Sequence, residues 1–248
     1  MSYIFTVSPD FSPEHISGWY IFNTWLQKQT GLPIHLSMHN NFQSQRAAIQ
    51  NDGIDLIYAN PYDAAMLVRE KAFRPLTKPQ GLSDEAVVAV FAGSPFLDIT
   101  DLQAGIKVAT TEAPDVNMIG MIMLEPADLN ATTIELQTFD SYVLIAKHLL
   151  RGDSDIGFFL AKAFDDLSAP IKSQLRILTR SQISVIHHSL MLGPKLIGQH
   201  DSISRQLIGM NADEKGRDVL ANLGFTGWDK VDDEEMEFMI DLMNTLIV

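Results

Sequence analysis

The chain has 248 residues, of which 46% are hydrophobic, and this is enough to bury one large domain or two smaller lobes. It contains no cysteine, which excludes disulfides, thiolate chemistry and cysteine-based zinc sites. With 31 acidic and 18 basic residues the formal charge is −13, so the surface repels nucleic acid and anionic membranes. We therefore expect no nucleic-acid partner, and the long-range field of the chain does not favour small anions.

The hydropathy pattern predicts no membrane insertion, because no run of 18 or more apolar residues occurs. The first residues lack a basic segment followed by an apolar core and a cleavage site, and they predict a strand from residue 3 instead. As written, the chain is expected to be cytoplasmic; it is expected to be periplasmic if an export signal has been removed.

The first third of the chain alternates strand and helix patterns, which predicts a mostly parallel sheet. Residues 55–59 form a short apolar run that suits a buried strand, and Asn60-Pro61 breaks it and starts a helix. Open α/β sheets place ligand sites where a strand ends in polar and aromatic residues and turns into a helix. The predicted elements here are strand 3–7, helix 13–31, strand 34–38, a helix after Asn41, strand 55–59 and a helix after Pro61.

Tyr58 and Tyr62 flank this break, and two interpretations of them remain open. In the first, both line a ligand cleft beside Asn60 at the carboxyl end of the strand. In the second, Tyr58 completes the core strand and Tyr62 packs on the following helix.

The rest of the chain repeats this layout once. Asp155 to Phe159 again follow a glycine–aspartate turn with a buried strand that ends in aromatic residues, although the residues themselves do not repeat. We therefore expect two similar α/β lobes. The predicted elements are strands 86–92, 106–109, 133–136 and 155–159, helices around 99–102, 118–123 and after Ser141, return strands 176–178 and 184–192, and helices within 212–248.

Several segments, in their order and spacing, resemble the substrate-binding proteins of phosphate, phosphite and phosphonate ABC transporters over nearly the whole chain. The resemblance implies a type II periplasmic-binding-protein fold. In such a fold two α/β lobes, each a mostly parallel sheet flanked by helices, are joined by two crossover strands and close over a ligand. The expected lobes are 1–93 with 183–248, and 94–182. The segments that carry the resemblance are Arg46–Ile49, Asp55–Tyr62, Thr100–Leu102, Gly152–Asp155, Arg176–Ser181, Gly216-Arg217 and Leu223-Gly224.

The resemblance also implies which residues contact the ligand. The first lobe is expected to use the loop after its first strand and the turn after residue 57, and the second lobe a polar turn and an acid. The predicted ligand-binding residues are Ser8, Asp10, Tyr58, Asn60, Tyr62, Thr110, Thr111, Glu112, Asp155 and His188.

The turn at Thr110–Ala113 differs from the pattern of the family it resembles. In phosphonate binders this turn resembles Ser-Thr-Ser-Gly at a helix start, where hydroxyls and backbone N–H groups hold the oxyanion. Here it contains Glu112, with Asp115 just beyond. Two like charges 4 Å apart cost about 4 kcal/mol at an effective dielectric of 20. We therefore expect a neutral or cationic ligand rather than phosphate.

The leading hypothesis is a non-catalytic solute-binding protein whose partner is an ABC-transporter permease or a sensor protein. The alternatives are a sensory ligand-binding protein, or a cytoplasmic enzyme on the same fold, as in menaquinone- and thiamine-type pathways, with Glu112, Asp155 or His188 as general base. No Walker, GxGxxG, GxSxG or HExxH pattern occurs, and we expect no cofactor. We expect no metal either, because His35 and His39 would lie roughly 13 Å apart on a strand.

Overall fold

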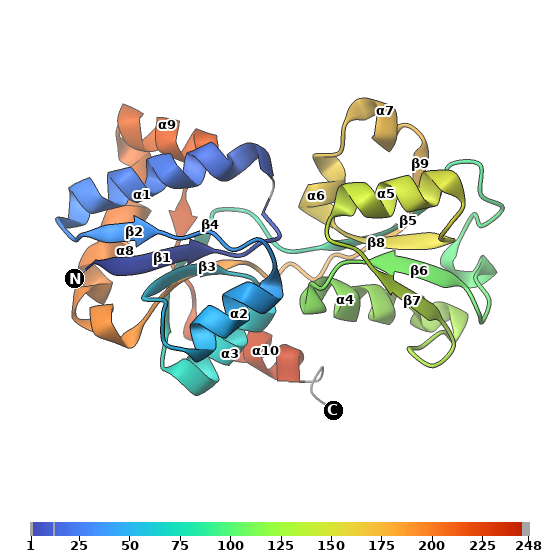
Figure 1. The fold of residues 1–248 in the computed structure, drawn as a ribbon, viewed down its shortest axis with the longest axis horizontal. Helices are drawn as coiled ribbons and strands as arrows, with labels where there is room; N and C mark the ends of the chain where they lie inside the picture. Colours follow the sequence, from blue (N-terminus) through green and yellow to red (C-terminus); the bar gives the residue numbers. More distant parts are fainter. Residues whose placement is uncertain (1, 12, 245–248) are drawn as a thin grey trace. The chain divides into compact units, whose positions relative to one another are not determined.

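The computed structural model describes residues 2–11 and 13–244, and its chain divides into two compact units (Figure 1). The divisions lie between Ser83 and Asp84 and between Ser184 and Val185. Unit 2 is therefore the continuous segment Asp84–Ser184, and unit 1 is made from the chain on both sides of it.

Unit 1 contains a six-stranded sheet in the order β11-β4-β10-β3-β1-β2. β1 is parallel to β2 and β3, whereas β10 runs antiparallel between β3 and β4, and β11 is antiparallel to β4. The strands are β1 (Tyr3–Val7), β2 (Ile34–Leu36), β3 (Leu56–Ala59), β4 (Arg74–Pro79), β10 (Ser189–Leu192) and β11 (Trp228–Asp229).

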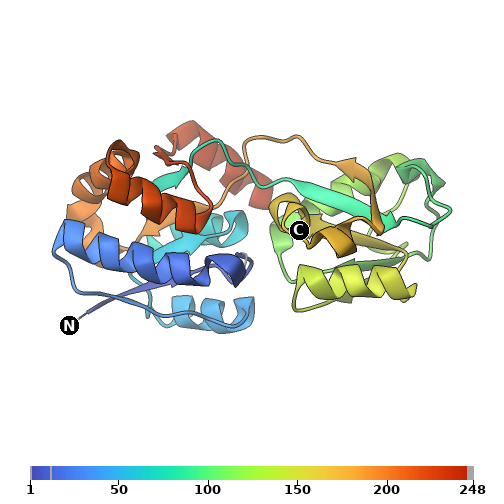
Figure 2. The ribbon, with the colours of Figure 1, turned by 90° about the horizontal axis from the view of Figure 1, so that it is seen from above.

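Helices cover both faces of this sheet. The views in Figures 1 and 2 show α1 and α9 side by side on one face, and α2, α3 and α10 on the other. The helical elements of unit 1 are η1 (Pro13–His15), α1 (Ile16–Thr30), α2 (Phe42–Gln50), α3 (Pro61–Lys71), η4 (Pro194–Gln199), α8 (His200–Ile208), η5 (Met210–Ala212), α9 (Glu214–Leu223) and α10 (Asp233–Asn244).

The core of unit 1 is aromatic. Trp19 and Phe22 of α1 pack on each other and on Phe5 of β1, with ring centroids 5.7–6.1 Å apart. Phe22 also packs on Trp228, at 5.8 Å. Tyr58 lies in the same cluster, which also includes apolar side chains of α8 and α9. The strand residues of alternate positions face this cluster, as expected for a sheet covered on both sides.

Unit 2 contains a five-stranded sheet in the order β7-β6-β8-β5-β9. β6 is parallel to β7 and β8, whereas β5 is antiparallel to β8 and β9. Its strands are β5 (Ala86–Phe91), β6 (Lys107–Thr110), β7 (Glu135–Thr138), β8 (Ile156–Leu160) and β9 (Leu175–Arg180), and its helical elements are η2 (Ile99–Asp101), α4 (Pro114–Leu124), η3 (Glu125–Ala127), α5 (Tyr142–Arg151), α6 (Ala161–Asp165) and α7 (Ala169–Lys172).

Helix boundaries follow local chemistry. The side chains of Asn41 and Ser141 accept hydrogen bonds from backbone N–H groups of the first turns of α2 and α5. Gly31 and Gly224, at φ 69° and 73°, end α1 and α9 in the left-handed conformation. Glycine adopts this conformation without steric cost, which explains why both helices end at these positions.

Three expectations need correction. The sheets are mixed rather than mostly parallel, because β10 in unit 1 and β5 in unit 2 insert antiparallel to their neighbours. The first division lies near residue 84 rather than after 93, because β5 pairs with β8 and β9 of unit 2. The predicted return strand 184–192 is shorter, since only Ser189–Leu192 are paired. The expected helical region 212–248 extends past residue 244, outside the described residues.

The two-lobe α/β class is the fold observed, with two mixed sheets flanked by helices. None of the helices within residues 2–11 and 13–244 combines the length and the apolar character that spanning a bilayer requires.

Candidate functional site

The carboxyl edge of the unit 1 sheet gathers most of the predicted ligand residues. β1 and β3 are parallel, so Ser8 and Asn60, which directly follow them, lie at the same edge. β10 runs the other way and pairs Ser189 with Ala59, so His188, just before it, also lies there. The topology therefore brings three distant segments of the chain together.

Asp10 and His188 form a buried pair at this edge. His188 Nε2 lies 3.1 Å from Asp10 Oδ1, and the two side chains are 7% and 3% exposed. Asp10 Oδ2 is also buried and accepts no hydrogen bond from the described residues. The histidine ring stacks on Tyr58, with centroids 5.2 Å apart, which fixes its orientation.

The charge of Asp10 depends on its neighbours. Burial alone would raise the pKa of this carboxyl group, but the charge of His188 and hydrogen bonds from His188, Ser8 and the Asp10 backbone outweigh it. The net effect is a pKa below the ordinary value of 3.8. Asp10 is therefore ionised at neutral pH, and a buried carboxylate oxygen stands ready to accept a donor.

Asn60 links the two strand ends to α3. Its Oδ1 accepts the backbone N–H of Asp63 at 2.8 Å, which caps α3, and Pro61 occupies the first helical position, where no backbone donor is lost. Its Nδ2 donates to Ser8 Oγ at 3.2 Å and to Asp63 Oδ2 at 2.9 Å. Asn60 is fully buried, so it serves as a rigid junction of this edge.

Asp63 and Arg46 continue the polar chain onto α2. Arg46 Nε donates to Asp63 Oδ1 at 2.7 Å, and the Arg46 side chain is 29% exposed while that of Asp63 is fully buried. Burial raises the pKa of Asp63 above its ordinary value, and the charge of Asp10 adds to this, although Arg46 and Asn60 oppose it. The two carboxylates of the edge thus shift in opposite directions.

The two tyrosines have different surroundings. Tyr58 is buried among Trp19, Phe225 and Trp228, so its ring supports the core and His188. Tyr62 is partly exposed, and its ring lies 5.0 Å from Arg46 Cζ. Tyr58 therefore packs as a core residue, as in the second interpretation of the sequence. Tyr62 packs against Arg46 of α2 and not only against its own helix.

In unit 2, Thr110 and Thr111 lie at the carboxyl end of β6, where the sequence predicts a ligand turn. Their side chains are engaged within the unit: Thr110 Oγ1 donates to Asn117 Oδ1, and Thr111 Oγ1 lies 3.5 Å from the Tyr142 hydroxyl. Asn117 Nδ2 returns a hydrogen bond to the Thr111 carbonyl at 3.1 Å. The turn is therefore held against the first turns of α4 and α5.

Glu112 is exposed in this turn, just before α4, and Asp115 is buried in the first turn of the helix. An acid in the first helical turn is favourable to the helix itself, because the N-terminus carries partial positive charge. The same acids reduce the attraction of that N-terminus for an external anion.

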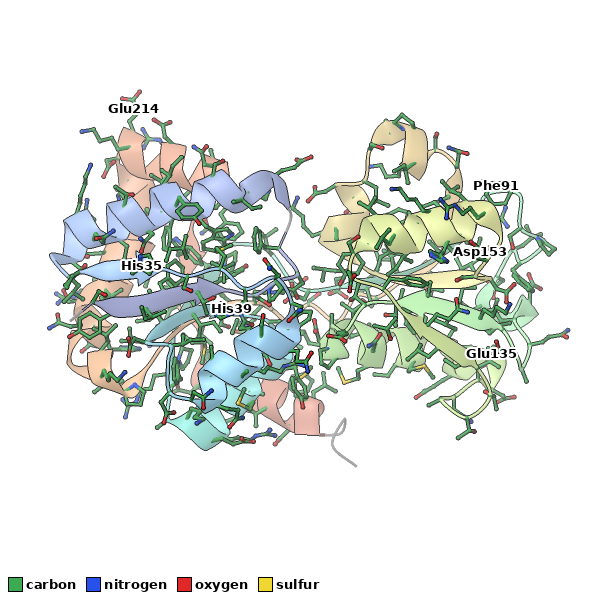
Figure 3. The ribbon with its side chains drawn as sticks, viewed as in Figure 1. His35, His39, Phe91, Glu135, Asp153 and Glu214 are labelled. Carbon is green, nitrogen blue, oxygen red and sulfur yellow. The ribbon has the colours of Figure 1, made fainter. Side chains whose placement is uncertain are left out.

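Asp155 does not lie with these residues. It precedes β8, at the amino edge of the sheet, whereas Thr110 and Thr111 follow β6 at the carboxyl edge. Figure 3 marks the amino edge by Glu135, the first residue of β7, and by Asp153 in the turn before β8. The structure thus separates Asp155 from the other unit 2 residues of the predicted set.

The role of Asp155 is visible from its counterpart in unit 1. Asp155 Oδ2 accepts the backbone N–H of Lys107 at 2.8 Å, and its own N–H donates to the Lys107 carbonyl at 2.9 Å. Asp55 makes the same two bonds with Ile4, at 2.9 Å and 2.8 Å. Each aspartate therefore fastens the start of one central strand to the start of its parallel neighbour.

The described residues contain no group of three or more side chains able to hold a metal ion. His35 lies in β2, and His39 lies beyond its end (Figure 3).

Two residues of this edge escape prediction from the sequence. Asp63 stands three positions after the cap Asn60. This spacing predicts an acid in the first turn of the helix, but it does not predict that Arg46 is the ion-pair partner of that acid. Arg46 follows Gln45 and precedes two alanines in α2, and only the packing of α2 beside α3 brings it to Asp63.

The comparisons with known proteins agree with this architecture. A family model described as the periplasmic substrate-binding protein of phosphonate ABC transporters matches residues 5–236. A search of the curated proteins found no match.

Solved structures share the fold at low sequence identity. PhnD1 from Prochlorococcus marinus, in complex with methylphosphonate, has a TM-score of 0.85 at 10% identity and covers 99% of this chain and 98% of its own. A binding protein component of an ABC phosphonate transporter from Pseudomonas aeruginosa has a TM-score of 0.80 at 14% identity, covering 99% and 86%. A Xanthomonas citri protein bound to ATP has a TM-score of 0.79 at 14% identity, covering 99% and 98%.

At 10–14% identity the solved structures establish the fold alone. The family model matches nearly the whole chain, and it therefore establishes the family. The family is one of substrate-binding proteins and not of enzymes, in agreement with the leading hypothesis and against the enzymatic alternative. The chain belongs to the phosphonate-binding family of periplasmic ABC-transporter substrate-binding proteins.

Proposed function

We propose that this protein binds a small polar molecule that carries a neutral or cationic donor group, and delivers it to the permease of an ABC transporter. Ser8, Asp10, Asn60 and His188 of unit 1 and the Thr110–Glu112 turn of unit 2 would contact the ligand, with closure of the two lobes over it. This role places the working protein in the periplasm. Family membership supports the general role, and the site chemistry supports the ligand class.

The observation that carries the ligand class is a carboxylate at the carboxyl edge of each sheet. In unit 1, Asp10 is ionised, and its buried Oδ2 accepts no hydrogen bond from the described residues. In unit 2, Glu112 is exposed beside the start of α4. A buried acceptor without a donor is costly, and a ligand N–H or ammonium group would satisfy it. An oxyanion placed next to Glu112 would be repelled by about 4 kcal/mol at 4 Å and an effective dielectric of 20.

Thermal-shift titration tests this proposal with three probes that differ in charge: inorganic phosphate, 2-aminoethylphosphonate and ethylamine. We expect the amine-containing probes to stabilise the protein more than phosphate does, because binding to the folded state alone raises the melting temperature. Stabilisation by phosphate alone would contradict the proposed ligand class.

Glu112→Gln refines the same experiment. Removal of the charge should strengthen phosphate binding relative to the amine-containing probes, because the repulsive term is lost. Glu125→Gln in η3 removes an equal charge from another exposed position of unit 2 and serves as the matched control. Equal changes in the two variants would assign the effect to net charge and not to the turn.

A further inference from the structure

The guanidinium group of Arg46 is held in one place at the carboxyl edge of unit 1. Its Cζ lies 5.1 Å from the ring centre of Phe42 and 5.0 Å from that of Tyr62, so aromatic rings contact it from two residues. Asp63 Oδ1 fixes its Nε at 2.7 Å. A long side chain with this support loses little further freedom when it binds a ligand.

Asp63 does not satisfy the whole guanidinium group. A carboxylate that faces arginine often uses both oxygens in two parallel hydrogen bonds. Here Oδ1 accepts from Arg46 Nε, but Oδ2 accepts from Asn60 Nδ2 at 2.9 Å. As a result, Arg46 Nη2 is buried and has no hydrogen-bond acceptor among residues 2–11 and 13–244.

This guanidinium group adjoins the residues of unit 1 that are proposed to contact the ligand. Asp63 and Tyr62 belong to the first turn of α3, directly after Asn60, and Asn60 is bonded to Ser8. The polar chain that starts at His188 and Asp10 therefore ends at Arg46. One end of the chain has a buried acceptor without a donor, and the other has a donor without an acceptor.

We infer that Arg46 binds the oxyanion group of the ligand, a phosphonate, sulfonate or carboxylate. The inference deepens the proposed function and rests on it, because it assigns the opposite end of the same molecule. Arginine presents planar, paired N–H donors that match these anions better than lysine does. The ligand would thus carry a negative group for Arg46 and a neutral or cationic donor for the carboxylates, rather than a single charge.

A purely structural arginine would behave differently. If Arg46 only fastens α2 to α3, its replacement lowers the melting temperature of the free protein and leaves ligand affinity unchanged. If it binds an oxyanion, affinity for anions falls while affinity for a plain amine does not.

The experiment measures dissociation constants by calorimetry on the full chain for methylphosphonate, methanesulfonate, acetate and ethylamine. In Arg46→Gln, we expect the anion bound by the unmodified protein to bind about tenfold more weakly or worse, since a hydrogen bond to a charged group is lost. Arg74→Gln, an exposed arginine of β4 in the same unit, is the matched control and should leave the constants unchanged. The three anions distinguish the phosphonate, sulfonate and carboxylate classes.

Asp63→Asn is a second, independent variant in case Arg46→Gln fails to fold. It keeps the shape of the side chain and removes the competing negative charge, so anion binding should become tighter. Equal anion affinity in the unmodified protein, Arg46→Gln and Asp63→Asn would overturn the inference while leaving the proposed function intact. Binding of ethylamine with no binding of any anion would also overturn it. Failure of all four probes to bind the unmodified protein would count against both.

Discussion

Asp10 and Asp63 lie at one sheet edge, and their pKa values shift in opposite directions. For Asp10, burial raises the pKa, but the charge of His188 and several hydrogen bonds lower it by more. For Asp63, burial raises the pKa by more than Arg46 and Asn60 lower it. The difference shows that partners, and not burial alone, determine the direction in which the pKa of each carboxyl group shifts. Because the pKa of each group differs between the folded and unfolded protein, these shifts also make the free energy of unfolding depend on pH.

Asp10 should stabilise the fold at neutral pH and not in strong acid. A carboxyl group whose pKa is lower in the folded state contributes stability that is complete above its unfolded value, near 3.8, and is lost as the pH falls through the folded value. We expect Asp10→Asn to lower the free energy of unfolding by about 1–3 kcal/mol at pH 6. The deficit should shrink as the pH falls below 3.8.

Urea denaturation of both proteins between pH 3 and 7 would measure this difference. Asp218→Asn removes an exposed carboxylate of α9 and is the control. A deficit that stays constant down to pH 3 would show that the charge of Asp10 does not contribute.

At this scale the sequence predicts the polar residues that end strands, because position after a strand is visible in the pattern. Ser8 and Asn60 meet for that reason. Arg46 is not predictable in the same way, because its partner Asp63 lies on a different helix, and helix packing is not encoded in a local spacing. Asp155 shows the converse: it precedes a strand that is parallel to β6, so it lies at the amino edge of the sheet, whereas Thr111 follows β6 at the carboxyl edge.

Helix packing in unit 1 depends on a close approach of α1 to α9. A Cβ atom added at Gly18 would lie 2.2 Å from the Asn222 carbonyl oxygen, so the backbones of the two helices meet where glycine leaves room. The residue is in a helix, where glycine is otherwise unfavourable.

Gly18→Ala should therefore destabilise the protein by about 1–3 kcal/mol, since the two helices must move apart. Gly198→Ala in η4 is the matched control, because nothing lies within 4 Å of its added Cβ, and it should be nearly neutral. Urea denaturation of the two variants at pH 7 would measure the difference. If the two alanine variants had equal stability, α1 and α9 would be able to move apart without lowering the free energy of unfolding.

The order of strands and helices was largely predictable from hydrophobic periodicity, but β4 was not. Its segment contains Pro75 and Pro79, and proline argues against a strand inside a sheet. The structure accommodates Pro75 opposite Met191, where the register of β10 shifts between Leu190 and Met191. Proline has no backbone N–H group, and the register shift allows β4 to pair without it at Pro75. Such a register shift cannot be predicted from a single sequence.

Unit 2 is one continuous segment with its own sheet and core. Its two ends are joined by Glu85, whose carboxylate accepts hydrogen bonds from the Ser184 and Ile183 N–H groups at 2.7 Å and 3.0 Å and from the Ser181 hydroxyl. All five strands of its sheet come from within the segment. Such a segment meets the requirements for independent folding.

We expect the isolated fragment 84–184 to fold, with a single cooperative unfolding transition by circular dichroism. Glu85→Ala should lower its stability by about 1–3 kcal/mol, since three donors lose a charged acceptor. Glu135→Gln, at an exposed position of β7, is the control. A fragment without a cooperative transition would show that unit 2 requires unit 1.

The place of β10 has a consequence for the order of events on the ribosome. β10 lies between β3 and β4 in the unit 1 sheet, yet it is synthesised after the whole of unit 2. Until residues 189–192 emerge, the early strands β1–β3 and the strand β4 have no central partner between them. Vectorial synthesis would therefore complete the inserted unit first, and the unit that contains the N-terminus would be the last to become native.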